Sequence, residues 1–228
     1  MHRPRNFRRH LYHGSRLECP CCGGRYRRFV ARNYRRDAIC PGCFAAERHR
    51  TLWLFLSRET DVLAGDKRIL HIAPEPSLAA KLRTIPGYIS ADLNPVRAMR
   101  TMDITAIPFA DESIDVILCN HVLEHIPDDL AALRELRRVL VPDGVAYMQH
   151  PISYDRDTYE DPSIASEKGR LRAFGQEDHV RVYGRDFDTR LKAAGFAPVI
   201  VRYESQVPEA ERRRYALGND PIHICRPV

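Results

Sequence analysis

The sequence predicts an α/β fold with a mostly parallel sheet, preceded by a small metal-binding module. Ile114 to Leu118 form a nearly continuous apolar run rich in β-branched residues, which is typical of a strand buried on both faces of such a sheet. Strand and helix patterns alternate from about residue 67 onward. Before them lie two closely spaced Cys-x-x-Cys pairs. A chain of 228 residues accommodates one α/β domain and a small module.

The first module contains two cysteine pairs, Cys19/Cys22 and Cys40/Cys43. The 17 residues between the pairs give a spacing typical of a four-thiolate zinc site. Because four thiolates leave no open coordination position, we expect a structural Zn²⁺, with iron as an alternative. Cys21 is a further candidate, as ligand or free thiol. Basic and aromatic residues alternate over Arg25 to Arg36 and predict a small hairpin, so residues 1–45 resemble a zinc ribbon.

Positive charge is concentrated at the start of the chain. Residues 1–50 contain 13 Arg against three acidic residues, whereas the whole chain has a net charge of +6. Arg-rich surfaces favour phosphates and other polyanions, so nucleic acid is a candidate partner. No apolar segment of about 7–15 residues follows the early Arg residues, and the run Leu52 to Leu56 is too short to cross a bilayer. We therefore expect a soluble, cytoplasmic protein without a membrane segment.

A linking segment, 46–66, and an alternating series of elements follow the metal module. Apolar residues recur at helical spacing over 44–62 and predict a helix there. Strands are expected at 67–72, 88–91, 102–105, 114–118, 145–149, 197–203 and 222–225. Helices are expected at 77–85, 127–140 and 184–194, the last one stopped by Gly195.

Polar residues follow the expected strands at their carboxyl ends, where ligands bind in open α/β sheets. Asp92 closes the second strand, and an acid at this place accepts hydrogen bonds from the hydroxyls of a cofactor ribose. Asp103 lies at the third strand. The fourth strand is followed by Asn120, His121, Glu124 and His125. We place the chemistry at this last group.

The order of these signals resembles a known enzyme family. The residues that carry the resemblance are the acid that closes the second strand, MDITAIPF at 102–109, DESIDVILCNHVLEHI at 111–126, LRELRRVLVPDG at 133–144 and AAGF at 193–196. Residues 67–228 look like the class I S-adenosylmethionine-dependent methyltransferases, in particular the group called methyltransferase type 11. The resemblance implies a Rossmann-like, seven-stranded, mostly parallel sheet whose last strand is antiparallel. It also implies S-adenosylmethionine over the ends of strands 1, 2 and 4.

The resemblance further assigns cofactor contacts by position. It implies that Asp92 holds the ribose and that Asp103 meets the adenine amino group, with Ile104 against the ring. Residues 120–123 would lie beside the methionine and the reactive methyl group. The expected contacts are His71, Ala73, Glu75, Asp92, Leu93, Asp103, Ile104, Asn120, His121 and Leu123.

The first turn departs from the family's pattern. It reads His71-Ile72-Ala73-Pro74-Glu75, where the family has an acid followed by a Gly-rich loop. Two prolines are expected to fix a different turn. Glu75 is a candidate partner of the cofactor's amino group, and His71 lies either at the cofactor or in a structural position below it.

Residues 151–183 are too long for an ordinary connection and predict a lid over the cofactor. His179 is the leading candidate for a general base, because the ordinary pKa of histidine is close to neutral, and Asp178 or Glu177 would orient its ring. His121, His125 and His150 compete for this role. Alternatively, His179 and Arg181 only anchor the lid by hydrogen bonds.

These features predict methyl transfer but leave the acceptor open, because the reaction mainly requires alignment of nucleophile, methyl group and sulfur. The two cysteine pairs together with ERHR at 47–50, HIAPEP at 71–76 and FGQEDHVRVYGRD at 174–186 resemble a bacterial subgroup of zinc-ribbon methyltransferases. By association, this subgroup favours a small molecule or a glycan or secondary-metabolite intermediate. The alternatives are an RNA methyltransferase, in which Tyr26, Phe29 and Tyr34 would stack on bases, and a non-catalytic zinc-bearing adaptor.

Overall fold

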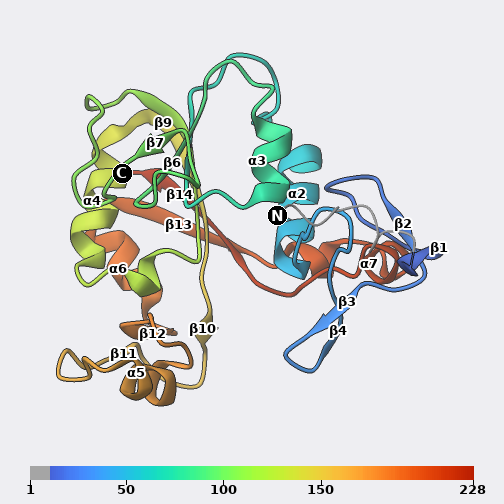
Figure 1. The fold of residues 1–228 in the computed structure, drawn as a ribbon. Helices are drawn as coiled ribbons and strands as arrows, with labels where there is room; N and C mark the ends of the chain where they lie inside the picture. Colours follow the sequence, from blue (N-terminus) through green and yellow to red (C-terminus); the bar gives the residue numbers. More distant parts are fainter. Residues whose placement is uncertain (1–10) are drawn as a thin grey trace. The chain divides into compact units, whose positions relative to one another are not determined.

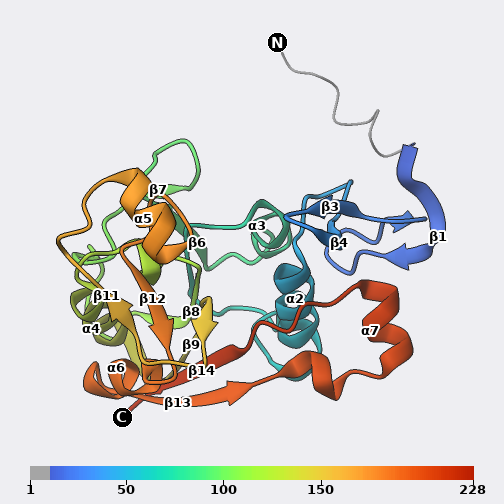
Figure 2. The ribbon, with the colours of Figure 1, turned by 90° about the horizontal axis from the view of Figure 1, so that it is seen from below.

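A computed structural model describes residues 11–228 and divides the chain into two compact units (Figures 1 and 2). The first unit runs up to residue 66 and includes 75–86 and 202–220. The second unit comprises 67–74, 87–201 and 221–228. Two segments that were expected inside the larger domain, 75–86 and 202–220, therefore group with the cysteine module. The first ten residues of the predicted module 1–45 lie outside the described residues.

The first unit combines short antiparallel strand pairs with helices. β1 (His13–Glu18) pairs with β2 (Arg25–Tyr26), and β3 (Val30–Arg32) pairs with β4 (Arg35–Ile39). The segment 25–36, predicted as one hairpin, therefore contributes to two strand pairs. Its first strand, β2, pairs with the preceding strand β1, and only β3 and β4 form a hairpin. The helices are α2 (Glu47–Glu59), α3 (Pro76–Leu82), the 3₁₀ helix η2 (Tyr203–Gln206) and α7 (Glu209–Tyr215).

Arg50 on α2 is fully buried and organises the first unit. Its guanidinium donates to the carbonyl oxygens of Ala38 and Ala45, at 3.0 and 2.8 Å, beside the second cysteine pair. It also donates at 2.8 Å to the carbonyl oxygen of Tyr215, at the end of α7, and lies 4.6 Å from the ring centre of Phe29. One side chain therefore joins segments from three parts of the sequence.

The second unit contains the predicted seven-stranded sheet, in the order β13-β14-β9-β8-β5-β6-β7 (Figure 1). The last strand, β14, is antiparallel to both of its neighbours, and the other pairs are parallel. This confirms the Rossmann-like fold class. The strands are β5 (Ile69–Ile72), β6 (Tyr88–Asp92), β7 (Arg100–Thr101), β8 (Ile114–Asn120), β9 (Leu140–Gln149), β13 (Phe196–Val201) and β14 (Ile222–Pro227).

The central strand β8 has only one residue, Asp115, that is not buried, as its apolar run predicts. Helix α4 (Asp129–Val139) begins where the Asp128 carboxylate accepts a hydrogen bond from the backbone of Ala131, and it buries the stripe that includes Leu133 and Leu136. Helix α6 (Phe187–Ala193) contributes Phe187 and Leu191 to the same core. In the part of the chain that the structure describes, no helix is both long and apolar enough to cross a membrane.

The strand expected at 102–105 is wrong. The third strand is the shorter β7, Arg100–Thr101, and Asp103 follows it in a turn. There the Asp103 carboxylate accepts hydrogen bonds from the backbone and the hydroxyl group of Thr105, at 2.8 and 2.7 Å. Such local side-chain bonds to the backbone favour a turn over a strand.

Residues 151–183 form an ordered substructure of the second unit. β10 (Ile152–Ser153), β12 (Arg181–Gly184) and β11 (Tyr159–Glu160) make a three-stranded sheet, accompanied by α5 (Glu167–Phe174). The buried Arg181 donates to the carbonyl oxygens of Leu123, Ile126 and Pro127. Strand β12 therefore holds the segment that follows β8 in place.

Candidate functional site

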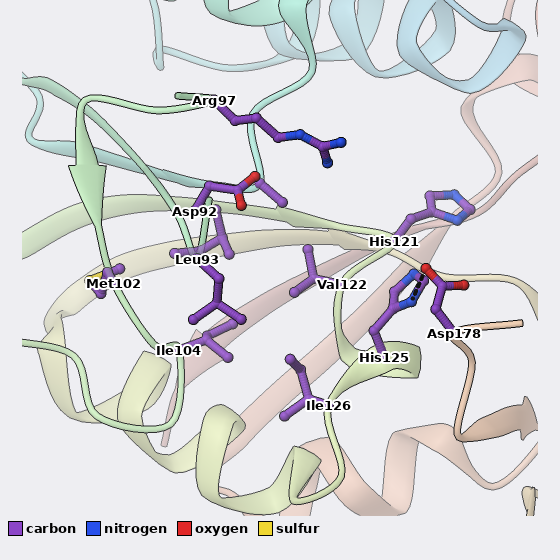
Figure 3. Close-up of a pocket in the computed structure, with 12 residues that line it drawn as sticks. Asp92, Leu93, Arg97, Met102, Ile104, His121, Val122, His125, Ile126 and Asp178 are labelled. Atoms are coloured by element: carbon purple, nitrogen blue, oxygen red, sulfur yellow. Dashed lines mark ion pairs between the residues drawn. The ribbon is translucent and has the colours of Figure 1, made fainter. Parts of the chain in front are cut away.

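A pocket of about 370 Å³ opens at the carboxyl ends of β5, β6 and β8 in the second unit (Figure 3). This is the edge of the sheet at which ligands bind in open α/β folds. The lining residues are Ile72, Ala73, Asp92, Leu93, Arg97, Met102, Ile104, His121, Val122, His125, Ile126 and Asp178.

One side of the pocket combines apolar side chains with Asp92 and Arg97. Leu93, Met102 and Ile104 gather on this side in Figure 3. All three residues follow β6 in the chain. Oδ1 of Asp92 accepts a hydrogen bond of 2.8 Å from the backbone of Asn94, which fixes the carboxylate at the end of β6. This side can hold a flat apolar ring system beside a group that carries hydroxyl donors.

The turn after β5 has left-handed backbone although it lacks glycine. Ala73 has φ +45°, and its N–H donates to the carbonyl oxygen of Ala91 at 2.7 Å. A non-glycine residue in this region is strained by about 1–2 kcal/mol, a cost that glycine in the usual loop avoids. His121, at the end of β8, is likewise left-handed, with φ +52°. Two turns that line the pocket are therefore held by the surrounding fold.

The opposite side of the pocket carries the histidine cluster, which comprises His121, Glu124, His125, His150, Asp178 and His179. The Glu124 side chain is only 1% exposed; its Oε2 lies 3.2 Å from Nδ1 of His150, and its Oε1 lies 3.3 Å from Nδ1 of His121. Burial alone would raise the pKa of the Glu124 carboxyl, but the close approach of His121 and His150 outweighs it and lowers this pKa. Glu124 is therefore ionised at neutral pH.

His125, Asp178 and His179 form the second half of the histidine cluster. Nδ1 of His125 lies 3.2 Å from Oδ2 of Asp178, and a dashed line marks this pair in Figure 3. The ring of His179 packs edge-on against that of His125, with 4.6 Å between ring centres. Burial lowers the pKa of His179, so this imidazole is neutral at neutral pH. Nε2 of His179 has no hydrogen-bond partner among residues 11–228.

The four predicted zinc ligands come together in the first unit. Sγ of Cys19 lies 3.6 Å from Sγ of Cys43, and Sγ of Cys22 lies 3.8 Å from Sγ of Cys40. The four sulfur atoms form one cluster and are compatible with a tetrahedral zinc site. Cys21 is not part of this cluster, because its thiol is directed at the carbonyl oxygen of His49, 3.7 Å away.

The pocket brings together seven of the individually named candidate residues, namely Ala73, Asp92, Leu93, Ile104, His121, His125 and Asp178. They meet because parallel strands present their carboxyl ends at one edge of the sheet. His179 is buried behind His125 and is not among the residues that line the pocket.

The remaining predicted contacts do not line the pocket. His71 is fully buried, and its Nδ1 lies 3.1 Å from the Tyr88 hydroxyl, as in the structural alternative. Leu123 and Asn120 are buried, and Asp103 is exposed in the turn after β7. Glu75 belongs to the first unit, where its carboxylate lies 4.0 Å from Nε2 of His49.

Sequence reasoning missed several lining residues. Ile72 and Ile126 flank predicted positions and are buried or partly buried apolar side chains, so nothing in the sequence distinguishes them from core residues, whereas Val122 lies within the predicted range 120–123. Met102 was placed in a strand rather than in the pocket wall. Arg97 lies in the segment between β6 and β7, where the pattern contains no signal for a ligand.

A seven-stranded sheet with an antiparallel last strand, and a pocket over β5, β6 and β8, define the fold as that of a Rossmann-like methyltransferase. In agreement, residues 63–148 match the family described as "Methyltransferase domain". The match covers β5, β6, β7, β8, α4 and most of β9. The matched residues include the ends of β5, β6 and β8 at which the pocket opens.

Similar proteins carry methyltransferase descriptions. An uncharacterised methyltransferase of Mycobacterium sp. (strain KMS) is 42% identical over 110 residues, which is 41% of this chain and 42% of that protein. The malonyl-[acyl-carrier protein] O-methyltransferase of Halorhodospira halophila is 27% identical over 55% of this chain and 42% of its own length. The chain thus spans less than half the length of these relatives.

Solved structures share the fold at low sequence identity. The YcgJ protein of Bacillus subtilis superimposes with a TM-score of 0.52 and 16% identity, over 79% of this chain and 100% of that chain. A Haloferax volcanii methyltransferase, solved in complex with the Trm112 methyltransferase activator, gives a TM-score of 0.52 and 15% identity over 78% of this chain and 88% of that chain. At this identity the likeness shows the fold alone.

Proposed function

We propose that the protein transfers a methyl group from S-adenosylmethionine and that the cofactor binds in the pocket over β5, β6 and β8. The observation that carries the proposal is the Asp92 carboxylate, fixed at the end of β6 beside an apolar wall, within a segment that matches a methyltransferase domain. An acid at this place accepts hydrogen bonds from the ribose hydroxyls. S-Adenosylmethionine supplies the electrophilic methyl group when it is bound.

The residues present fit such a cofactor. Leu93, Met102 and Ile104 form the apolar wall on which the adenine ring would rest. Asn120, at the carboxyl end of β8, is 4% exposed, and neither polar atom of its side chain has a partner within the described chain. Asn120 does not line the pocket but directly precedes His121, which does; because buried unpaired polar atoms cost about 1–3 kcal/mol each, a polar ligand group that reached past His121 would stabilise this side chain.

The acceptor would approach from the side of the histidine cluster. His121 and Asp178 line the pocket there, whereas His179 lies behind His125. Proton removal by His179, oriented by Asp178, stays a hypothesis in which His125 would have to move. His121 is the candidate that already reaches the pocket, with its Nδ1 held near Glu124.

We further propose that the acceptor is a small molecule or a glycan or secondary-metabolite intermediate rather than RNA. Two of the three aromatic residues of a base-stacking platform, Tyr26 and Phe29, are 3% and 2% exposed and pack edge-on against each other in the first unit. Only Tyr34 of the three is exposed. Since base stacking requires accessible aromatic faces, this arrangement does not favour the nucleic-acid alternative.

We expect Asp92→Ala to weaken binding of S-adenosylmethionine by about 10- to 150-fold, because a hydrogen bond to a charged group contributes about 1.5–3 kcal/mol. Calorimetry with the full chain measures this directly. Asp103→Ala is the matched control: it removes the same group from an exposed turn outside the pocket wall and is expected to have the smaller effect. Unchanged affinity of the Asp92 variant would place the ribose elsewhere.

The acceptor class is tested with isotopically labelled S-adenosylmethionine and a bacterial extract that has been separated into RNA and low-molecular-mass fractions. Label transferred to the low-molecular-mass fraction is expected. Label in the RNA fraction, together with RNA affinity that falls steeply with salt, would instead support the RNA alternative.

A further inference from the structure

The histidine cluster holds three potential metal ligands that the proposed methyl transfer does not require. One ligand atom from each of Glu124, His125 and His179 lies within 4.8 Å of the other two. The three residues belong to the second unit and share no side chain with the four-cysteine cluster. We propose that these side chains bind one divalent transition-metal ion beside the pocket.

The first support is that two of the three groups are buried and present free electron pairs. His179 is 4% exposed, and its Nε2 has no hydrogen-bond partner in the described part of the chain. Glu124 is 1% exposed, and its Oε1 accepts no hydrogen bond of normal geometry, although it lies 3.3 Å from Nδ1 of His121. A metal ion would satisfy both atoms at once and so remove the cost of their burial.

The second support is the set of outer partners. Metal-binding histidines commonly present their other ring nitrogen to a carboxylate, and metal-binding carboxylates are themselves hydrogen-bonded. His125 shows the first feature, with its Nδ1 3.2 Å from Oδ2 of Asp178. Glu124 shows the second, with its Oε2 3.2 Å from Nδ1 of His150. The ring orientation of His125 and the carboxylate plane of Glu124 are therefore set before an ion arrives.

The donor set selects the kind of ion. Two imidazoles and one carboxylate suit Mn²⁺, Fe²⁺, Co²⁺, Ni²⁺ or Zn²⁺, whereas Mg²⁺ and Ca²⁺ prefer oxygen ligands alone. Three protein ligands leave at least one coordination position open, in contrast to the closed shell of four thiolates. Because His125 lines the pocket, the open position would be reached from it, and an oxygen ligand such as water or a hydroxyl group would fill it.

The fold holds the three ligands in place from two directions. Glu124 and His125 lie in the 3₁₀ helix η1 (Leu123–His125) that follows β8, and His179 lies two residues before β12. The backbone N–H of Val180 donates to the carbonyl oxygen of Glu124 at 2.9 Å, directly beside the candidate site. The Arg181 side chain also donates hydrogen bonds to the carbonyl oxygens of Leu123, Ile126 and Pro127, which lie in and just after η1.

The test is a titration of the full chain, saturated with one Zn²⁺ per molecule, with Mn²⁺ followed by electron paramagnetic resonance. Mn²⁺ has little affinity for thiolates and accepts carboxylate and imidazole ligands, so it reports the histidine cluster without displacing Zn²⁺ from the four cysteines. We expect one Mn²⁺ per chain. The measurement contains no S-adenosylmethionine, so its failure leaves the proposed methyl transfer standing.

His125→Gln is the informative variant, because this side chain is 30% exposed and its loss does not open the core. It is expected to weaken Mn²⁺ binding at least tenfold, and Asp178→Asn by about 10-fold or more, since partners that orient a ligand contribute about 10–100-fold in metal affinity. His13→Gln, which removes an exposed histidine of the first unit, is expected to leave the affinity unchanged.

His179→Ala is expected to abolish Mn²⁺ binding, with circular dichroism as the check that the buried change has not unfolded the chain. Two results would overturn the proposal. One is a wild-type chain that takes up no second ion at millimolar Mn²⁺. The other is a His125→Gln variant that is folded and binds Mn²⁺ as tightly as the wild type.

Discussion

Replacing Cys40 with Ser is expected to release zinc and to unfold the first unit, while the second unit keeps its cooperative unfolding. Cys40 is fully buried, and its backbone closes the second turn of the cluster through bonds to Ala45 and Phe44, at 2.9 Å each. The paired strands of this unit form two sheets of two strands each, which are marginal without further support. Zinc binding in such modules contributes about 10–16 kcal/mol of apparent folding free energy, so no other single change is expected to cost as much.

Elemental analysis and thermal unfolding measure this effect together. The Cys40→Ser variant is expected to contain one zinc fewer per chain than the wild type, with the loss of one unfolding transition and the retention of the other. Cys21→Ser is the matched control, since Cys21 is a buried cysteine of the same module that is not one of the four clustered ligands and whose thiol donates to the carbonyl oxygen of His49. A wild-type chain without metal, or a Cys21→Ser variant that loses it, would contradict the assignment of the four ligands.

The sheet of the second unit could be predicted because its strands carry strong local signals. The β-branched run of β8 is buried almost throughout, as expected for a central parallel strand. The third strand was misplaced because the sequence at 102–105 is typical of a short apolar strand. In the structure, the backbone and the hydroxyl group of Thr105 donate hydrogen bonds to the Asp103 carboxylate and form a turn. That 75–86 and 202–220 belong with the cysteine module was not predictable, because the contacts responsible, such as those of Arg50 with Tyr215, join residues far apart in the sequence.

In the candidate site, too, residues with a local sequence signal could be predicted, and contacts between residues far apart in the sequence could not. Asp92 and His121 were found because each directly follows a strand, and the topology then brings such positions together. His71 was predicted by the same argument, but it lies inside β5 and its ring contacts the Tyr88 hydroxyl. A polar residue near the end of a strand is therefore not always accessible to a ligand. The partners of Glu124 could not be predicted, because His150 follows β9 and the distances depend on how β8 and β9 align.

Replacing Arg50 with Met is expected to destabilise the first unit by several kcal/mol, because each buried carbonyl oxygen left without a donor costs about 1–3 kcal/mol. Burial lowers the pKa of the Arg50 guanidinium, and the nearby Cys19 and Glu47 offset this only in part. Met fills most of the volume but donates no hydrogen bond. The carbonyl oxygens of Ala38 and Tyr215 would then lose the guanidinium as donor, and that of Ala45 would keep only the backbone N–H of Cys40.

Chemical denaturation with zinc release as the readout reports the first unit selectively. Arg58→Met is the matched control on the same helix, because Arg58 is 37% exposed and its ion pair with Glu211 is an ordinary surface pair. Such pairs contribute about 0–1 kcal/mol, so the two variants should differ by several-fold in the free energy lost. Equal effects would show that Arg50 acts only as a surface charge does. The Arg50→Lys variant separates the effect of charge from that of geometry, because lysine keeps the charge but cannot donate in several fixed directions. Its free energy of unfolding is expected to be closer to that of Arg50→Met than to that of the wild type.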